Sequence, residues 1–530
     1  MASRFSITTP IYYVNDRPHI GHVYTTLVAD VVARHHRQRG DDVFFLTGTD
    51  EHAPKVAESA RAHGVEPSAW ADRHAAAFQE TFAALGIGND DFIRTTQPRH
   101  TERVREYLAA LLRSGDVYQD RYDGWYDPGQ EEYIPESRAA RLDYRSPISG
   151  KPLVRRQEDN YFFRLSAYTD DLLRLLDQRP DFVQPIARRN EVAARIRDGL
   201  HDFPISRTGL AWGIGIPGDE RHTVYVWIDA LFNYVSTVDT PDRRHLWPAD
   251  VHLIAKDILW FHAVIWPAFL LALQRQPGYE WIELPRRVYA HSFWVRDGRK
   301  MGKSLGNFVD LDQLEQYRQT LSLDGLRYFL AKEGPIDVSD RDFTEARIAE
   351  VYNAELANQF GNLVHRAASL VARYTDGVVP TPGRLTPADV RLRAEAAALP
   401  ERVSSAFDRL ALDRAAEAIV RFVTAANRYA DETAPWQRAR EGNHERLATS
   451  LAHLVEAARL AAWHLWPFIP ETAAEAHRRL SGHDVCPGLG AFGAVGPGSH
   501  VAVGSPLFPR LQSATPLTPA LSLREVARPS

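Results

Sequence analysis

Apolar residues follow different spacings along the chain, and each spacing predicts a different kind of structure. Near the start, a continuous apolar run at 43–46 ends in small and acidic residues at 47–52, as in a buried parallel strand that opens onto a crevice. A short strand at the start of 9–22 precedes it, and helical patterns lie at 23–37, 53–64, 67–85 and 100–114. Strands alternating with helices predict an α/β nucleotide-binding domain.

The pattern changes twice further along. Between 115 and 222 short aromatic-rich strands and turns, at 122–126, 145–150 and 160–165, predict an insertion into the sheet. We expect the sheet to resume at 223–234 and to continue at 251–257. Beyond 345 apolar residues recur every three or four positions, which predicts a helical bundle ending near 480. The remaining stretch is rich in Gly, Pro and Ser, and we expect a loop there.

Composition narrows the setting but not the function. The 530 residues, 44% hydrophobic and 25% charged, are typical of a globular chain with several domains. No apolar run approaches the ~20 residues of a membrane span and no leader pattern is present, so we expect a cytoplasmic protein without a membrane partner. A net charge of -5 gives no nucleic-acid signature. The single cysteine, Cys486, excludes internal disulfides and cysteine-based zinc knuckles.

Two short motifs carry the candidate chemistry. The join between the first strand and helix holds His19, Gly21 and His22, which places two imidazoles on one face of a helix N-terminus where an anion can bind. A glycine-punctuated turn at 297–307 presents Lys300 and Lys303. Alone, the first motif would more often be two solvated histidines and the second a solvated basic turn. Their order and separation favour a shared phosphate site.

Together these motifs resemble the HIGH and KMSKS signatures of class I aminoacyl-tRNA synthetases, and residues from about 5 to 480 resemble the methionyl-tRNA synthetase family most closely. The resemblance implies an α/β class I Rossmann-like catalytic domain with an inserted connective-peptide domain, followed by an α-helical anticodon-binding bundle. The implied boundaries are 1–114 and 223–322 for the catalytic halves, 115–222 for the insertion, 323–344 for a stem-contact region, 345–485 for the bundle and 486–530 for a tail.

The implied reaction is methionine–tRNA ligation. Methionine attacks the α-phosphate of ATP, and the aminoacyl group then passes to tRNA(Met). By resemblance, His19 and His22 stabilise the transition state, Lys300 and Lys303 bind the β- and γ-phosphates, and Mg²⁺ arrives with ATP. The remaining ATP-binding positions are Asn15, Gly21, Lys256, Asp257 and Ser304. Gly302 departs from the serine usual in the family, so we expect a freer lysine loop and catalysis that persists at a lower rate.

The resemblance also places the methionine pocket. Asp50 would bind the ammonium group, the Tyr234 hydroxyl and the main-chain N–H of Ile11 would address sulfur, and aromatic rings would wall the thioether. The implied positions are Ile11, Tyr13, Asp50, Arg207, Trp227, Ala230, Leu231, Tyr234, Ile258, His262 and Trp266. A surface ion pair is nearly as good an interpretation of Arg207.

In the bundle, Asn362, Arg366 and Trp436 resemble the residues of the family that read the CAU anticodon. An aromatic ring can stack on an unstacked base, and Asn and Arg can bond to base edges. In the insertion, Asp127, Gln130, Ser146 and Ser149 stand where relatives carry zinc-binding cysteines. This donor set suits zinc poorly, so we predict a metal-free knuckle and no structural zinc.

Two other functions stay open at this point. Gly302, Ala53 and Ala255 replace residues that are usual in the family, which would suit a specialised or inhibitor-tolerant duplicate synthetase. A catalytically weak tRNA-binding regulatory protein belongs to a different class, and the four intact motif residues argue against it. Because too few patterned residues follow the bundle for a dimerising tRNA-binding barrel, we expect a monomer.

Overall fold

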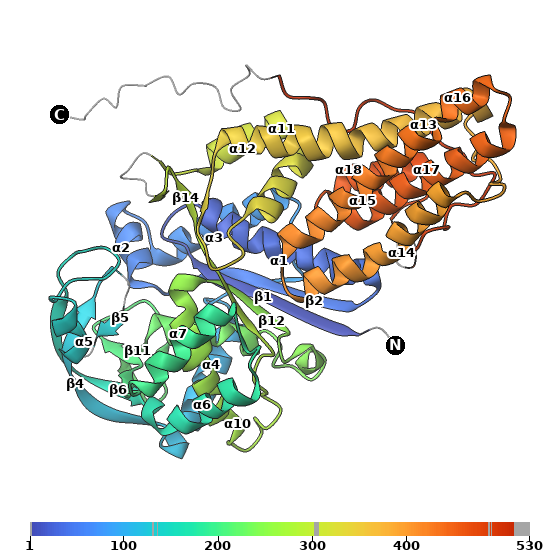
Figure 1. Cartoon of the computed structure of the whole chain (residues 1–530). Coiled ribbons are helices and arrows are strands. Elements are labelled where there is room, and N and C mark those ends of the chain that lie inside the picture. Colours follow the sequence, from blue (N-terminus) through green and yellow to red (C-terminus); the bar gives the residue numbers. More distant parts are fainter. Residues whose placement is uncertain are drawn as a thin grey trace, which may run out of the picture.

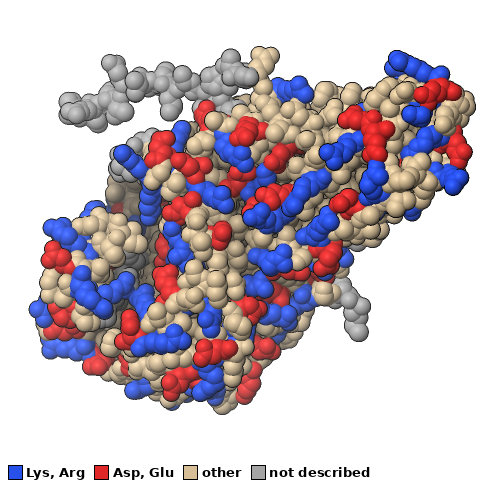
Figure 2. All heavy atoms as spheres, in the orientation of Figure 1, with Lys and Arg blue, Asp and Glu red and all other residues tan. Residues whose placement is uncertain are grey.

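The computed structural model describes residues 3–129, 132–134, 136–301, 307–485, 488 and 490–512. A sheet-containing body occupies the lower left of Figure 1, and a helical bundle extends from it to the upper right. On the face shown in Figure 2, Lys and Arg alternate with Asp and Glu over both parts, in keeping with a net charge of -5. Within the described residues, none of the helices combines the length and apolar character that a membrane span requires.

The body is built on a six-stranded parallel sheet with the strand order β3-β2-β1-β12-β13-β7. Its strands are β1 (Arg4–Tyr13), β2 (Asp42–Asp50), β3 (Asp91–Arg94), β12 (Val251–Ala255), β13 (Val288–His291) and β7 (Val183–Gln184). The chain runs outward from β1 through β2 to β3 and later returns to the other side of β1 as β12. The strand order therefore reverses between β1 and β12, and ligands of such sheets bind at the carboxyl ends next to that reversal.

Helices cover the sheet as the periodicity predicts. They are α1 (Ile20–Arg39), α2 (Pro54–Ala62), α3 (Pro67–Ala84), α4 (Pro98–Ser114) and α10 (Trp266–Gln274). α1 begins with a capping box between His19 and His22 and ends at Gly40, whose left-handed φ of 87° suits glycine. Fourteen of its twenty residues are buried, because the helix lies between the sheet and the bundle (Figure 1).

The insertion forms a separate antiparallel sheet with the order β5-β4-β6-β8, accompanied by α-helices. Its elements are β4 (Val117–Asp127), β5 (Glu132–Ile134), α5 (Glu136–Arg141), β6 (Val154–Phe163), α6 (Thr169–Gln178), α7 (Ile186–Arg197) and β8 (Phe203–Pro204). Of the predicted short strands and turns, the segment at 145–150 is a turn closed by an isolated bridge between Arg145 and Pro152. One strand within the predicted insertion, β7, joins the main sheet beside β13.

The prediction that the main sheet resumes at 223–234 is wrong. A small antiparallel sheet contains β9 (Ser206–Thr208), β10 (Gly215–Ile216) and β11 (Asp219–Val224), and two short helices follow, α8 (Val226–Leu231) and α9 (Asn233–Ser236). The run is buried on nearly every side, so it lacks the alternation that separates a strand from a helix. After β7, the next strand of the main sheet is β12.

A hairpin carries the start of the lysine motif. It consists of β14 (Trp294–Arg296) and β15 (Arg299–Lys300), with Asp297 and Gly298 at φ 55° and 66° in the turn, and β16 (Arg341–Asp342) pairs with β14. Between them runs α11 (Leu311–Glu333), which is interrupted at Ser322 (φ 66°, ψ 165°). Gly302, Lys303 and Ser304 lie outside the described residues.

The C-terminal part of the chain is a helical bundle, as the apolar periodicity beyond residue 345 predicts. Its elements are α12 (Glu345–Val351), a π-helical stretch at Tyr352–Gly361, α13 (Asn362–Thr375), α14 (Pro387–Asp408), α15 (Leu412–Thr433), α16 (Pro435–Arg440), α17 (His444–Leu465) and α18 (Pro470–Ser481). The following segment packs back on it, because the Glu456 carboxylate accepts from the main-chain N–H groups of Gly493 and Ala494 at 2.7 and 3.0 Å. One hydrophobic cluster runs from β1 and α1 into this bundle.

Candidate active site

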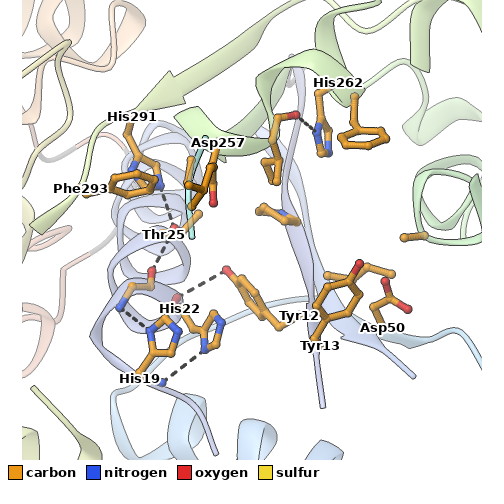
Figure 3. A pocket seen from close by; sticks show the side chains of 18 of the residues that line it. Tyr12, Tyr13, His19, His22, Thr25, Asp50, Asp257, His262, His291 and Phe293 are labelled. Carbon is orange, nitrogen blue, oxygen red and sulfur yellow. Dashed lines mark hydrogen bonds between the residues drawn. The ribbon is translucent and has the colours of Figure 1, made fainter. Parts of the chain in front are cut away.

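A pocket of about 710 Å³ lies at the carboxyl ends of the central strands, where the strand order reverses. It is bordered by the end of β1, the first turn of α1, α8 and the start of the lysine hairpin. Of the residues predicted for the site, those lining it are Ile11, Tyr13, Asn15, His19, Gly21, His22, Asp50, Trp227, Ala230, Leu231, Tyr234, Asp257, Ile258, His262 and Lys300. Figure 3 shows His19 and Phe293 on one side, and Asp50 and His262 on the other.

The two histidines of the first motif are held by the main chain of the helix start. The Gly21 N–H donates to Nδ1 of His19 at 3.0 Å, and the His19 N–H donates to Nδ1 of His22 at 3.3 Å. Their rings stack with centroids 3.7 Å apart. Since each Nδ1 accepts a hydrogen bond, it carries no proton, and each neutral ring has its proton on Nε2. The pair therefore offers two N–H donors to the pocket.

His22 is kept in this neutral form by its surroundings. Burial, and secondarily the adjacent His19 ring, lower the pKa of His22 well below its usual range. Its ring also lies against those of Tyr12 and Phe78, with centroid separations of 4.7 and 5.2 Å. His22 is therefore an uncharged hydrogen-bond donor at neutral pH.

The same side of the pocket carries charged groups from later in the chain. Lys300 lines the pocket, with its ammonium 5.3 Å from the centroid of the Phe293 ring. Asp257, on the turn after β12, lies beside Phe293 (Figure 3). The cleft desolvates the Asp257 carboxylate and raises its pKa, and Lys300 partly offsets this. Imidazole, ammonium and carboxylate groups thus converge from segments nearly three hundred residues apart.

The other side is largely aromatic. The Trp227 ring stacks on Phe261 with centroids 4.0 Å apart, and Tyr13 meets Trp227 edge-on at 6.2 Å. Ala230 and Leu231 line the same lobe. Asp50, at the end of β2, adds a buried carboxylate. This lobe suits an amino acid with an unbranched apolar side chain, because the rings can enclose the side chain while Asp50 binds the ammonium group.

Tyr234 and His262 form a hydrogen bond in this lobe, at 2.8 Å. Burial lowers the pKa of His262 to about 4, and its Nδ1 lies 3.0 Å from the Ile258 carbonyl, which can only accept. Nδ1 therefore carries the proton and Nε2 accepts from the Tyr234 hydroxyl. In this structure the hydroxyl proton of Tyr234 is directed at His262.

Three predicted residues, all in the described part of the chain, lie outside the pocket lining. Lys256 pairs with Asp340 at 2.6 Å. Trp266 is fully buried behind Tyr234 and donates to Nε2 of His252 at 3.2 Å. Arg207 is also buried, with its guanidinium 4.3 Å from the Tyr126 ring centroid, so the interpretation as a surface ion pair is wrong.

Comparison with known proteins identifies the family. A family model described as "tRNA synthetases class I (M)" matches residues 5–141 and 139–368, and one described as "Anticodon binding domain of methionyl tRNA ligase" matches 379–514. The methionine–tRNA ligase of Mesorhizobium japonicum is 43% identical over 480 residues, covering 89% of this chain and 90% of the relative. The chain belongs to the methionyl-tRNA synthetase family.

Other members of this family agree with that assignment. The methionine–tRNA ligase of Mycobacterium tuberculosis is 41% identical over 526 residues, covering 97% of this chain and 99% of the relative. The structure of the M. tuberculosis methionyl-tRNA synthetase in complex with methionyl-adenylate matches with a TM-score of 0.89 at 40% identity, over 96% of this chain and 100% of that one. Its apo form matches with a TM-score of 0.83. The predicted family and fold class are confirmed.

Some residues at this methionyl-tRNA synthetase pocket were not predicted from sequence. His291, at the end of β13, lies 2.8 Å from the Thr25 hydroxyl and lines the pocket with Phe293. The short apolar run before His291 resembles the run before Asp50, and that signal could have identified it. Lys55 and Arg138 line the mouth, where Lys55 donates to the Gly129 carbonyl at 2.9 Å. These two come together only in the folded chain.

The residues predicted to read the anticodon lie together in the bundle. The Arg366 guanidinium is 5.0 Å from the centroid of the Trp436 ring and pairs with Asp431 at 2.6 Å. Asn362 is exposed one turn before Arg366 and donates to Asn427 at 3.4 Å. The half-buried Trp436 and these polar groups form one patch at the junction of α13, α15 and α16.

The knuckle of the insertion is held by side-chain to main-chain hydrogen bonds. Asp127 accepts from the Gly129 N–H at 2.8 Å, and the Ser146 hydroxyl accepts from the Ser149 N–H at 3.1 Å. Gln130 lies outside the described residues. Residues 127–150 contain neither Cys nor His, so their donors do not fit a tetrahedral zinc ion. A metal-free knuckle stays a prediction.

Proposed function

We propose that this pocket performs methionine–tRNA ligation with ATP, with the residues in the roles given below. The observation that carries the proposal is the convergence of two neutral imidazole donors and Lys300 on one side of a pocket whose other side is aromatic and contains Asp50. The first side suits a triphosphate and the second suits methionine. Membership of the methionyl-tRNA synthetase family supports the same activity.

In the first step, the methionine carboxylate attacks the α-phosphate and pyrophosphate leaves. No protein nucleophile is needed, so the enzyme acts by positioning and by stabilising charge. We assign His19 and His22 to the equatorial oxygens of the α-phosphate. We assign Lys300 to the β- and γ-phosphates. Lys303 has the same proposed role on the basis of the sequence motif alone. Mg²⁺ enters as a complex with ATP. Asn15, Gly21, Asp257 and Ser304 complete the proposed ATP site.

Methionine recognition follows from the shape of the aromatic lobe. Asp50 binds the ammonium group, while Trp227, Ala230, Leu231 and Ile258 enclose the thioether. Since the Tyr234 hydroxyl donates to His262, a sulfur bond to that hydroxyl requires the His262 bond to break first. We therefore assign selection of sulfur mainly to shape and to the polarizable aromatic contacts.

We propose for Lys256 a role other than direct contact with ATP. Its ammonium is bound to Asp340 beside the pocket and lies 4.7 Å from the Phe293 ring centroid. In this arrangement it fixes Phe293 and the segment before β16 next to Lys300. We propose that Lys256 supports the nucleotide side of the pocket and does not bind a phosphate in this conformation.

We propose that Asn362, Arg366 and Trp436 read the CAU anticodon of tRNA(Met). The test is charging of a CAU tRNA and of an altered-anticodon tRNA by the wild type and by Trp436→Ala. Because one base stack contributes ~1–3 kcal/mol, charging of the CAU tRNA should fall roughly 5- to 150-fold. Methionine-dependent ATP–pyrophosphate exchange should be unchanged, which serves as the control. Wild-type charging of both tRNAs by the variant would contradict the assignment.

The same exchange assay tests the catalytic proposal itself. Purified protein should exchange pyrophosphate into ATP only when methionine is present. A protein that binds tRNA(Met) without exchange would be the regulatory protein considered from sequence. A specialised duplicate would exchange normally but show different inhibition constants from a housekeeping enzyme. The predicted monomer is checked by light scattering during gel filtration, and the predicted cytoplasmic location by cell fractionation.

A further inference from the structure

A chain of four buried polar side chains lies behind the methionine side of the pocket. His52 and His100 contact opposite oxygens of the Asp229 carboxylate, at 2.6 Å from Nδ1 and 2.7 Å from Nε2 respectively. The other nitrogen of His100 lies 2.8 Å from the Ser236 hydroxyl. Asp229 is 1% exposed and His100 is fully buried. Of these four described residues, none lines the pocket.

The centre of this chain is an ionised carboxylate. Burial alone would raise the pKa of Asp229, but His52 and His100 outweigh it and lower the pKa to about 2. Asp229 therefore only accepts, and each histidine donates one N–H to it. Hydrogen bonds to a charged group are stronger and more directional than neutral ones. The three residues form a stiff unit.

This unit joins the two segments that carry the proposed methionine site. Asp229 lies on α8 between Trp227 and Ala230, both of which line the pocket. His52 follows the end of β2, two residues after Asp50. The contact between Asp229 and His52 thus fixes the apolar wall relative to the carboxylate that binds the ammonium group.

Glu51, which lies between Asp50 and His52, is anchored independently of α8. The Glu51 carboxylate accepts two hydrogen bonds from Arg94, at 2.7 and 3.0 Å, and the Glu51 N–H donates to the Thr95 hydroxyl at 2.9 Å. The end of β2 is therefore rigid, and α8 is tied to it through Asp229. Loss of the Asp229 contact should let α8 move, while the end of β2 keeps its place.

We propose that Asp229 is a positioning residue for methionine, which sets the spacing between the ammonium site at Asp50 and the thioether wall on α8. This inference rests on the proposed function of the pocket. Asp229 contacts no substrate in it. Its effect should appear in methionine binding and leave the ATP side, built from α1 and the lysine hairpin, nearly unchanged.

The test is Asp229→Asn in ATP–pyrophosphate exchange. An asparagine has one acceptor oxygen, so its amide faces one of the two histidine N–H groups and the charge is lost. The KM for methionine should rise about tenfold, because small displacements of a binding group weaken productive geometry strongly. The KM for ATP should stay within about twofold. Ser236→Ala, at the far end of the chain, should raise the KM for methionine less, about threefold.

The matched control is Asp389→Asn in the bundle. Asp389 is also a fully buried carboxylate with strong partners, Tyr429 and Arg446, but lies far along the chain in α14. The Asp389→Asn variant should lower the melting temperature about as much as Asp229→Asn does, and it should leave both KM values unchanged. Two results in Asp229→Asn and Ser236→Ala would overturn the inference. One is an equal rise in the KM for methionine and the KM for ATP. The other is a fall in melting temperature with no change in either KM. Absence of exchange by the wild type would instead refute the proposed function.

Discussion

Individual side chains in the pocket are set by main-chain hydrogen bonds more than by their own charge. His19 and His22 both use Nδ1 to cap the first turn of α1, which directs Nε2–H toward the pocket. A histidine pair in sequence does not reveal which nitrogen is protonated. The helix start decides it, because its main-chain N–H groups need acceptors.

At this scale we predict that His22→Ala lowers kcat for ATP–pyrophosphate exchange about 100-fold with little change in KM, since one donor to the developing phosphate charge is lost. His22→Gln, which keeps an N–H donor, should retain more activity. Steady-state exchange kinetics with both substrates varied would check this. A large rise in the KM for ATP with unchanged kcat would show that His22 binds the ground state instead.

The pH dependence of the same step follows from the lowered pKa of His22. The ring stays neutral as pH falls through about 6.5, the usual value for histidine. Protonation of His22 should therefore cause no loss of kcat between about pH 8 and pH 6. A kcat that rises as pH falls across this range, measured in the wild type and absent in His22→Gln, would mean that a charged His22 is the active form.

At the scale of elements, α1 connects the phosphate side of the pocket with the bundle. Its middle carries Asp30, fully buried, which binds Arg327 of α11 at 2.6 Å and Arg34 at 2.7 Å. Burial raises the pKa of Asp30, but Arg327 and then Arg34 outweigh it and hold the pKa below its usual value. Near its end, Gln38 donates to the Trp463 carbonyl of α17 at 2.6 Å.

We predict that Arg327→Met destabilises the protein by roughly 3 kcal/mol, because it leaves a buried carboxylate with one partner fewer. Denaturant unfolding followed by circular dichroism would measure the loss. The matched control is Arg414→Met, whose side chain is 65% exposed and pairs with Glu417 at 3.0 Å. Solvent screens that exposed pair, so its loss should change the free energy of unfolding far less. Equal losses in the two variants would show that the Asp30–Arg327 pair has no special weight.

The element scale also shows where sequence patterns lose their information. The helices predicted at 23–37, 53–64, 67–85 and 100–114 lie within a few residues of α1 to α4, because their apolar faces repeat with the helical period. The same repeat predicted a helical bundle beyond 345, without bounds for its individual helices. The apolar run at 223–234 predicts a strand of the main sheet. In the structure its first two residues are the last two of β11, and most of the rest of the run belongs to α8 and α9. A segment buried on nearly all sides carries no such repeat.

At the scale of the whole molecule, several histidines are buried with lowered pKa values. Burial lowers the pKa of His291 to about 4 and that of His464 to about 3, and it lowers those of His35 and His252 well below the usual range. In the unfolded chain each would titrate near 6.5. Below about pH 6.5 the unfolded state therefore binds more protons than the folded state, and the free energy of unfolding decreases as the pH is lowered.

We predict that the melting temperature falls between about pH 7 and pH 5, in the window where these histidines protonate only on unfolding. Ion-paired carboxylates such as Asp229, whose pKa is about 2, contribute no such loss until lower pH. Differential scanning calorimetry in buffers of equal ionic strength would check this, with His464→Gln expected to show a shallower fall. A melting temperature that is constant or rises over this window would contradict the prediction.

The sequence by itself determined the family, the fold class, the first helices around the sheet, the helical character of the bundle and most of the residues of the pocket. His19, Asp50, Trp227 and Lys300 could be named in advance because motif residues keep their order and spacing, and the structure brings them to one cavity. Their catalytic and binding roles stay predictions.

Only the tertiary structure decided which of those residues face the pocket and what supports them. Trp266 turned out to lie behind Tyr234, Lys256 is bound to Asp340, and Asp229 ties α8 to the end of β2. These facts depend on contacts between residues far apart in the chain, where burial and hydrogen bonding select one orientation. No local pattern of residue types encodes such an orientation, so it becomes visible only when the sheet, insertion and helices are packed together.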